Sequence, residues 1–180
     1  MNVLAISGSL RKSSKNSALL EAAQQLAPAG MAIELDDSIG ALPHFNPDLD
    51  AVDGAAMPAS AARWRARVAA ADGVLISSPE YAHGVPGVLK NALDWLVSST
   101  EVPGKPFALL TASSLSVHAP AQLREILTTM NTRFVDDASV AIPVSGGVRD
   151  ASAIVCDAER SAMLRAALEA FRRAISAGAK

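Results

Sequence analysis

Residues 2–17 read Asn-Val-Leu-Ala-Ile-Ser-Gly-Ser-Leu-Arg-Lys-Ser-Ser-Lys-Asn-Ser, and they carry the clearest indication of the fold. Its start, Val3–Ile6, is a continuous apolar run, which is typical of a strand buried on both faces. A loop of small and polar residues follows, and apolar positions at helical spacing then predict a helix over 16–27. A buried strand, a polar loop and a helix, in this order, form the first unit of a parallel sheet.

The same alternation continues along the chain. Two further apolar runs predict buried strands over 73–77 and 107–111, and the segments 31–35 and 134–142 are also predicted as strands. Amphipathic stretches predict helices over 59–71, 86–98 and 120–130, and a last helix that begins near Asp157. The segment 38–58 has no period and is rich in proline and glycine, so we expect a long loop there.

Strand–helix alternation with buried strands predicts an α/β fold. We expect a flavodoxin-like, doubly wound parallel sheet of five strands in the order 2-1-3-4-5, with helices on both faces. A chain of 180 residues favours one such domain over residues 1–180, and the sequence contains no repeat or linker that would divide it.

Composition excludes several classes of protein. Half of the residues are hydrophobic and 19% are charged, so the chain is not intrinsically disordered. A net charge of −2 gives no field that would attract nucleic acid, and no apolar run approaches the ~18 residues that span a bilayer. The single cysteine, Cys156, excludes an internal disulfide, and the N-terminus lacks the basic region of a signal peptide. We therefore expect a cytoplasmic protein without a nucleic-acid or membrane partner.

Ligands of such a sheet bind beyond the carboxyl ends of the strands, which directs attention to the loops 7–16, 78–87 and 111–119. The first loop offers hydroxyls, an amide and the Arg11 guanidinium beside a helix N-terminus, a combination that suits a phosphate group. It contains neither Gly-x-Gly-x-x-Gly nor Gly-Lys-Ser/Thr, so a terminal monophosphate fits better than a dinucleotide or triphosphate. The alternative is that its serines and asparagine only cap the helix.

The second loop contains two prolines and two glycines, which give it a fixed and irregular path. Tyr81, the only tyrosine of the chain, lies in this loop and can offer a ring face or a hydroxyl to a flat heterocycle. The alternative is that the loop only reverses the chain direction.

Two motifs together resemble the NADPH-dependent FMN reductase family. They are Gly-Ser-Leu-Arg-x-x-Ser-x-Asn over 8–16, and Pro-Glu-Tyr over 79–81 followed by Pro-Gly-Val-Leu-Lys-Asn-Ala-Leu-Asp-Trp over 86–95. The resemblance extends from Val3 to about Met130 and includes the segment 42–49. It implies a flavodoxin-like oxidoreductase with FMN as cofactor, NADPH or NADH as hydride donor, and a small-molecule electron acceptor such as a quinone, flavin, azo compound or metal oxyanion.

The resemblance also implies the residues that bind the cofactor. Those of the first loop, at the FMN phosphate, are Ser9, Arg11, Ser14, Asn16 and Ser17. Those of the second loop, along the ribityl chain and isoalloxazine, are Pro79, Glu80, Tyr81, Ala82 and His83. Ser113 and Ser114 follow in the third loop, and a homodimer or a dimer of dimers through 86–98 and 42–49 is implied as well.

The third loop departs from the family, which commonly carries glycines beside the flavin here. This chain has Ser114, Leu115, Val117 and His118 instead. We expect these side chains to narrow access to the ring while leaving FMN binding intact.

The remaining candidates favour simpler interpretations. Three histidines, His44, His83 and His118, lie in three loops at the predicted ligand edge. Their separations in the sequence do not match the spacing of metal ligands in known sites, so we expect no metal site. No serine or cysteine occurs in a nucleophile motif, and we expect no catalytic side chain. Two other functions stay open: a flavodoxin-type electron carrier, and a family member that has lost flavin or nucleotide use and acts as a binding protein.

Overall fold

The computed structural model of the chain describes residues 1–50, 57–144 and 150–178. Within these ranges a six-stranded parallel sheet forms the centre of the molecule, in the order β2-β1-β3-β4-β5, and β6 also pairs with β4. Its strands are β1 (Asn2–Ser7), β2 (Ala32–Asp36), β3 (Gly73–Ser77), β4 (Pro106–Thr111), β5 (Arg133–Phe134) and β6 (Val140–Ala141). The predicted order of the sheet is confirmed.

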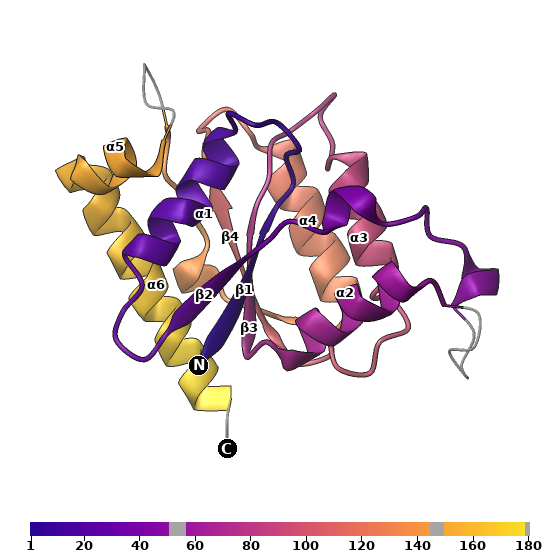
Figure 1. Cartoon of the computed structure of the whole chain (residues 1–180). Helices are drawn as coiled ribbons and strands as arrows, with labels where there is room; N and C mark the ends of the chain where they lie inside the picture. Colours follow the sequence, from indigo (N-terminus) through magenta and orange to yellow (C-terminus); the bar gives the residue numbers. More distant parts are fainter. Residues whose placement is uncertain (51–56, 145–149, 179–180) are drawn as a thin grey trace.

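Helices cover both faces of the sheet (Figure 1). One face carries α1 (Lys15–Gln25), α5 (Ala151–Cys156) and α6 (Ala158–Gly178). The opposite face carries α2 (Ala59–Ala70), α3 (Gly87–Asp94) and α4 (His118–Thr129). Among all the residues that the structure describes, no helix is both long and apolar enough to cross a membrane.

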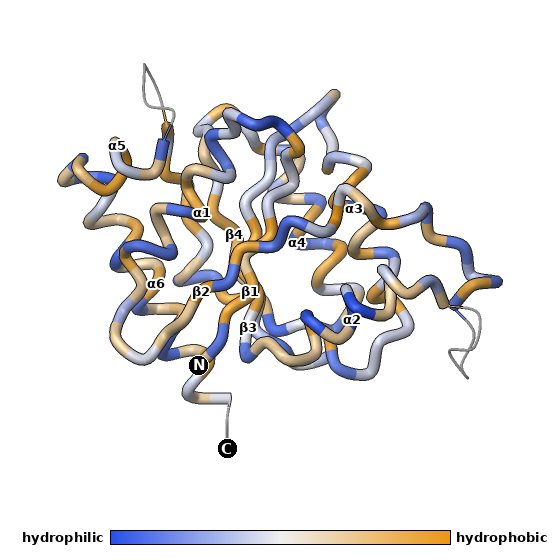
Figure 2. Tube along the Cα trace, in the orientation of Figure 1, coloured by the Kyte–Doolittle hydropathy of each residue, from blue (hydrophilic) through white to orange (hydrophobic). Residues whose placement is uncertain are grey.

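The sheet separates two apolar cores. Figure 2 shows hydrophobic residues, in orange, along β1 at the centre of the molecule. Along β1, Val3 and Ala5 pack on the α1 side, whereas Leu4 and Ile6 pack on the α2 side. Both faces of the strand are therefore buried, which explains its continuous apolar run. Trp64 and Trp95 are buried on the α2 side, and the indole N–H of Trp95 donates to the Pro43 carbonyl oxygen at 2.8 Å.

The prediction of one strand over 134–142 is wrong. The segment instead forms β5 and β6 with a 3-10 turn, Asp136–Ala138, between them. The ladder is interrupted because the Ser139 hydroxyl, rather than a backbone carbonyl, accepts the Leu109 N–H at 3.1 Å. The same hydroxyl donates to the Val135 carbonyl oxygen at 2.8 Å, which closes the turn.

The other predicted helices and loops differ less from the structure. The helix α5 was not predicted; Asp150 caps it by accepting the Ala153 N–H at 2.8 Å. Asp157 accepts the Arg160 N–H at 2.9 Å, so the predicted start of the last helix is confirmed. The predicted loop 38–58 contains two 3-10 turns, Ile39–Ala41 and Pro47–Leu49, and its residues 51–56 lie outside the described ranges.

Candidate functional site

The loops that follow β1 and β3 touch each other at the carboxyl edge of the sheet. The Gly8 N–H donates to the Ser77 carbonyl oxygen at 2.8 Å. A Cβ atom at Gly8 would lie 2.4 Å from Ser78 Oγ and 2.9 Å from Ser78 Cβ, closer than non-bonded atoms approach. Only glycine permits this contact, so Gly8 sets how closely the two loops pack.

These two loops enclose a hollow of about 310 Å³, which we call the carboxyl-edge hollow. Its lining residues are Ser9, Arg11, Ser13, Ser14, Lys15, Asn16, Pro79 and Tyr81. Six residues predicted to bind the cofactor therefore lie around one space. Tyr81 is 55% exposed, so much of its side chain is open to solvent at the hollow.

The N-terminus of α1 opens onto this hollow. Ser14 caps the helix, its Oγ accepting the Ser17 N–H at 3.3 Å, and the first turn contains no acidic residue. Within residues 1–50, 57–144 and 150–178, the charged ends of Arg11 and Lys15 have no hydrogen-bond or ion-pair partner. Two cations thus lie at the positive end of a helix dipole, an arrangement that favours an anion between them.

Asn16 and Ser17 connect α1 to the strands behind the hollow. The buried Asn16 Oδ1 accepts a hydrogen bond from Ser77 Oγ at 3.0 Å. Ser17 Oγ and Ser7 Oγ form a hydrogen bond of 2.9 Å. These bonds fix the helix N-terminus relative to β1 and β3.

The second loop makes a tight turn after Tyr81. The Tyr81 and Gly84 backbones exchange two hydrogen bonds, of 3.1 and 2.9 Å, and the two residues between them, Ala82 and His83, have φ of 49° and 58°. Positive φ at both central residues defines a type I′ turn, in which glycine or asparagine is the usual residue. The turn is therefore held in a strained backbone conformation by its surroundings.

Glu80 points away from the carboxyl-edge hollow and caps α4. Its Oε2 accepts the N–H of His118 at 2.7 Å and that of Ala119 at 2.9 Å. The bond from Ala119 is the main cause that lowers the pKa of Glu80 below its ordinary value. No side chain of the adjoining residues caps α4, so this carboxylate from another loop supplies the cap.

Gln122, which sequence reasoning did not single out as a site residue, makes a second link between this turn and α4. Its Nε2 donates to the His83 carbonyl oxygen at 3.0 Å, and its Oε1 accepts the Val85 N–H at 3.2 Å. No motif or spacing in the sequence indicates this role.

The third loop follows β4, and none of its residues lines the carboxyl-edge hollow. Ser113 Oγ accepts the Leu115 N–H at 3.2 Å, and Ser114 is exposed. Leu115 and Val117 are 86% and 60% exposed. Their apolar side chains project into solvent instead of packing against the protein.

Two of the three histidines lie together. The ring centroids of His83 and His118 are 4.3 Å apart, with 23° between the ring planes. His44 is exposed on the loop after β2 and is not part of this pair. The sequence separation of the pair concealed the contact, although both residues follow neighbouring strands of the sheet.

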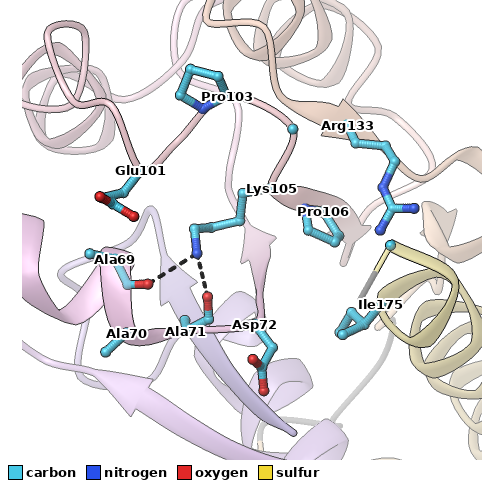
Figure 3. Close-up of a pocket in the computed structure, with 12 residues that line it drawn as sticks. Ala69, Ala70, Ala71, Asp72, Glu101, Pro103, Lys105, Pro106, Arg133 and Ile175 are labelled. Carbon is cyan, nitrogen blue, oxygen red and sulfur yellow. Dashed lines mark hydrogen bonds between the residues drawn. The ribbon is translucent and has the colours of Figure 1, made fainter. Parts of the chain in front are cut away.

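A second hollow, of about 340 Å³, lies at the amino edge of the sheet (Figure 3). Lys105 Nζ donates there to the carbonyl oxygens of Ala69 and Ala71, at the C-terminal end of α2. Burial lowers the pKa of Lys105. None of the residues predicted to bind the cofactor lines this hollow.

The chain belongs to the NADPH-dependent FMN reductase family, whose match covers residues 1–146. It is accordingly an oxidoreductase of a family that uses FMN and NAD(P)H, which confirms the expected enzyme class and cofactors.

Similar proteins carry related names. An NAD(P)H-dependent FMN reductase of Pseudomonas aeruginosa is 37% identical over 96% of this chain and 94% of its own. A quinone reductase of Escherichia coli K12 is 36% identical over 73% of this chain and 71% of its own. Among solved structures, the flavoenzyme FerB of Paracoccus denitrificans, an NAD(P)H:(acceptor) oxidoreductase, is 31% identical, with a TM-score of 0.85 over 98% of this chain and 97% of that one.

Proposed function

We propose that the chain binds FMN with its phosphate in the carboxyl-edge hollow and passes electrons from NAD(P)H to a small-molecule acceptor of the quinone type. The observation that carries the proposal is the pair of cations at the N-terminus of α1, Arg11 and Lys15, whose charged ends have no partner among the described residues. The hydroxyls, guanidinium, ammonium and helix N–H groups there are the donors that a phosphate monoester needs, so the residues present fit the cofactor.

Each part of the site has a separate task in this proposal. Arg11 binds two phosphate oxygens in a fork, while Ser9 and Ser14 donate from their hydroxyls. Asn16 and Ser17 hold the helix end in position. Pro79, Tyr81 and the backbone of Glu80, Ala82 and His83 would hold the ribityl chain and the ring, and Ser113 and Ser114 would contact the cofactor from the third loop. Bound FMN supplies the hydride-accepting chemistry, so no side chain of this chain acts as an acid or base.

Two observations support a quinone-type electron acceptor: exposed apolar side chains, and the names of similar proteins. Tyr81 lines the hollow and is exposed, and Leu115 and Val117 are exposed on the loop after β4. Exposed apolar side chains of this kind suit a planar, largely apolar acceptor. The similar proteins include quinone reductases. Their names support a quinone over a metal oxyanion.

We further propose that two copies pair through α3 and α4. Trp95 and Leu96 are buried within the chain, so the surface that remains for a partner is a groove of about 220 Å³ that includes Leu93, Val97, Ile126 and Met130. The loop 42–49 joins this region, because Phe45 packs edge-on against Trp95 with centroids 5.2 Å apart. A single sedimenting species at the mass of one chain, at micromolar concentration, would contradict the dimer.

A cytoplasmic location is proposed as well, from the near-neutral charge and the single cysteine.

Anaerobic stopped-flow absorbance tests the activity. The FMN-loaded chain is mixed with NADPH or NADH, and then with 1,4-benzoquinone. We expect bleaching of the flavin by a reduced nicotinamide nucleotide and recovery of its colour with the quinone. A flavin that stays oxidised with both nucleotides would contradict the proposal.

The double variant Ser114→Gly/Val117→Gly tests the third loop in the same experiment. If these side chains narrow access to the ring, the variant bleaches faster than the natural chain, because even a small displacement on the hydride path slows transfer. Equal rates would show that this loop leaves the ring open.

A further inference from the structure

Three side chains with metal-ligating atoms gather at the N-terminus of α4. Glu80 and His83 come from the loop after β3, and His118 is the first residue of α4. One ligand atom from each, a carboxylate oxygen and two imidazole nitrogens, lies within 4.8 Å of the other two. We propose that Glu80, His83 and His118 form a binding site for one divalent transition-metal cation, of which Zn²⁺ is the best match.

The donor set selects this class of cation. Two imidazole nitrogens and one carboxylate oxygen are ligands that Zn²⁺ and its neighbours among the transition metals accept readily. Ca²⁺ and Mg²⁺ instead require sites made almost wholly of oxygen. Three protein ligands leave the fourth position of a tetrahedral zinc ion to water.

The ligands need only a small rearrangement to close on the ion. With metal–ligand bonds of about 2.0–2.1 Å, the ligand atoms of a tetrahedral site lie about 3.4 Å apart. The stacked rings of His83 and His118 have nearly parallel planes, so at least one ring must rotate to direct its nitrogen at a common point. Both histidines are exposed, and side-chain rotation costs little there.

Hydrogen bonds already fix the Glu80 carboxylate and the backbone of the turn that contains His83. The Glu80 Oε2 is used by the N–H groups of His118 and Ala119, which leaves Oε1 for the ion. Gln122 fixes the backbone on both sides of the turn by bonding to His83 and Val85. Outer hydrogen bonds of this kind orient metal ligands and strengthen their affinity.

Electrostatics set an upper limit on the affinity. The N-terminus of α4 carries a partial positive charge, which opposes a cation, and only the Glu80 carboxylate offsets it among the three ligands. An exposed site with three ligands and this opposing dipole binds in the micromolar range rather than as tightly as a closed structural zinc site.

The cluster and the carboxyl-edge hollow lie on different sides of one loop. Pro79 and Tyr81 line the hollow, whereas Glu80 bonds to α4 and His83 stacks on His118. A bound cation would tie this loop to α4. The metal site does not depend on the proposed reductase activity, so the two proposals can fail separately.

Titration calorimetry with Zn²⁺ tests the site, using the whole chain with and without FMN in a buffer that does not chelate metal. We expect one Zn²⁺ per chain with a micromolar Kd, and a rise in melting temperature when the ion is present. His83→Asn and His118→Gln should each weaken binding at least about tenfold, since even the loss of an outer-shell partner weakens metal binding about 10–100-fold. Asparagine suits position 83 because it tolerates positive φ.

His44→Gln is the matched control, since this exposed histidine lies outside the cluster and its loss should leave the Zn²⁺ affinity unchanged. Far-UV circular dichroism and thermal unfolding without metal establish that each variant is folded. The proposal is overturned if the natural chain does not bind Zn²⁺ below about 1 mM, a weak affinity by any standard for protein–metal sites. It is also overturned if His83→Asn keeps the full affinity, or if His44→Gln loses as much as the cluster variants.

Discussion

Two hollows of similar size lie at opposite edges of the same sheet, and their cations are used differently. At the amino edge, Lys105 and Arg133 donate to carbonyl oxygens at the C-terminal ends of α2 and α6. At the carboxyl edge, Arg11 and Lys15 lie at the N-terminus of α1. A helix C-terminus attracts a cation, whereas a helix N-terminus repels one.

This difference favours the carboxyl-edge hollow over the amino-edge hollow as the proposed binding site. The cations of the amino edge already stabilise the fold, and a ligand would have to compete with the helix ends for them. The cations of the carboxyl edge gain nothing from the helix beside them, and an anion would satisfy both. Volume alone, about 340 against 310 Å³, does not distinguish the two sites.

The largest effect is expected from Arg11→Ala. Loss of a charge-assisted fork to the phosphate should cost about 1.5–3 kcal/mol, or about ten- to a hundredfold in FMN affinity. Fluorescence titration with FMN and with riboflavin measures this, and riboflavin affinity should be unchanged. Equal weakening of both ligands would mean that Arg11 does not contact the phosphate.

Gly8→Ala should destabilise the carboxyl edge. The added Cβ would overlap Ser78, so the two loops must separate, at a cost of about 1–3 kcal/mol in the free energy of unfolding. Urea unfolding measures the change. Gly87→Ala is the control, because a Cβ there meets no atom within 4 Å. A Gly8→Ala chain as stable as this control would contradict the proposed contact.

Lys105→Met should have a smaller effect at the amino edge. The variant removes the hydrogen bonds to the end of α2 but also the cost of burying a charge, so we expect a net loss of about 1 kcal/mol. The FMN affinity should stay the same, because this hollow is separate from the proposed cofactor site. A drop in FMN affinity with unchanged stability would reverse the assignment of the two hollows.

The smallest effect is a pH dependence from the same residue. Burial lowers the pKa of Lys105 below its ordinary value of 10.5, so the unfolded chain keeps this proton to a higher pH than the folded chain does. The stability of the natural chain relative to Lys105→Met should therefore rise between neutral pH and about 10.5. Urea unfolding at a series of pH values would contradict this interpretation if the difference fell or stayed constant.

Most of the fold could be predicted because buried parallel strands are continuous apolar runs. Leu4 and Ile6 face one core while Val3 and Ala5 face the other. The strand therefore has no polar position that would interrupt the apolar run. The prediction failed over 134–142, where Ser139 replaces the strand ladder with a side-chain bond. A sequence does not reveal that a hydroxyl will be used in this way, since the partner Leu109 lies in another strand.

The candidate site could be predicted only to the level of its loops. Ser9, Arg11, Tyr81 and their neighbours lie together because the carboxyl ends of parallel strands meet at one edge. The direction of each side chain depends on irregular backbone, such as the positive φ of His83, which no periodicity encodes. For this reason the cap that Glu80 makes on α4, and the contact between His83 and His118, became apparent only in three dimensions.

The central claim is that the hollow at the N-terminus of α1 holds a phosphate group. The most direct test compares the affinities of the natural chain for FMN and for riboflavin, which differ only in that phosphate, by fluorescence titration at constant ionic strength. FMN should bind at least about tenfold more tightly, since charge-assisted hydrogen bonds to the phosphate are absent from riboflavin. Equal affinities for the two flavins would contradict it.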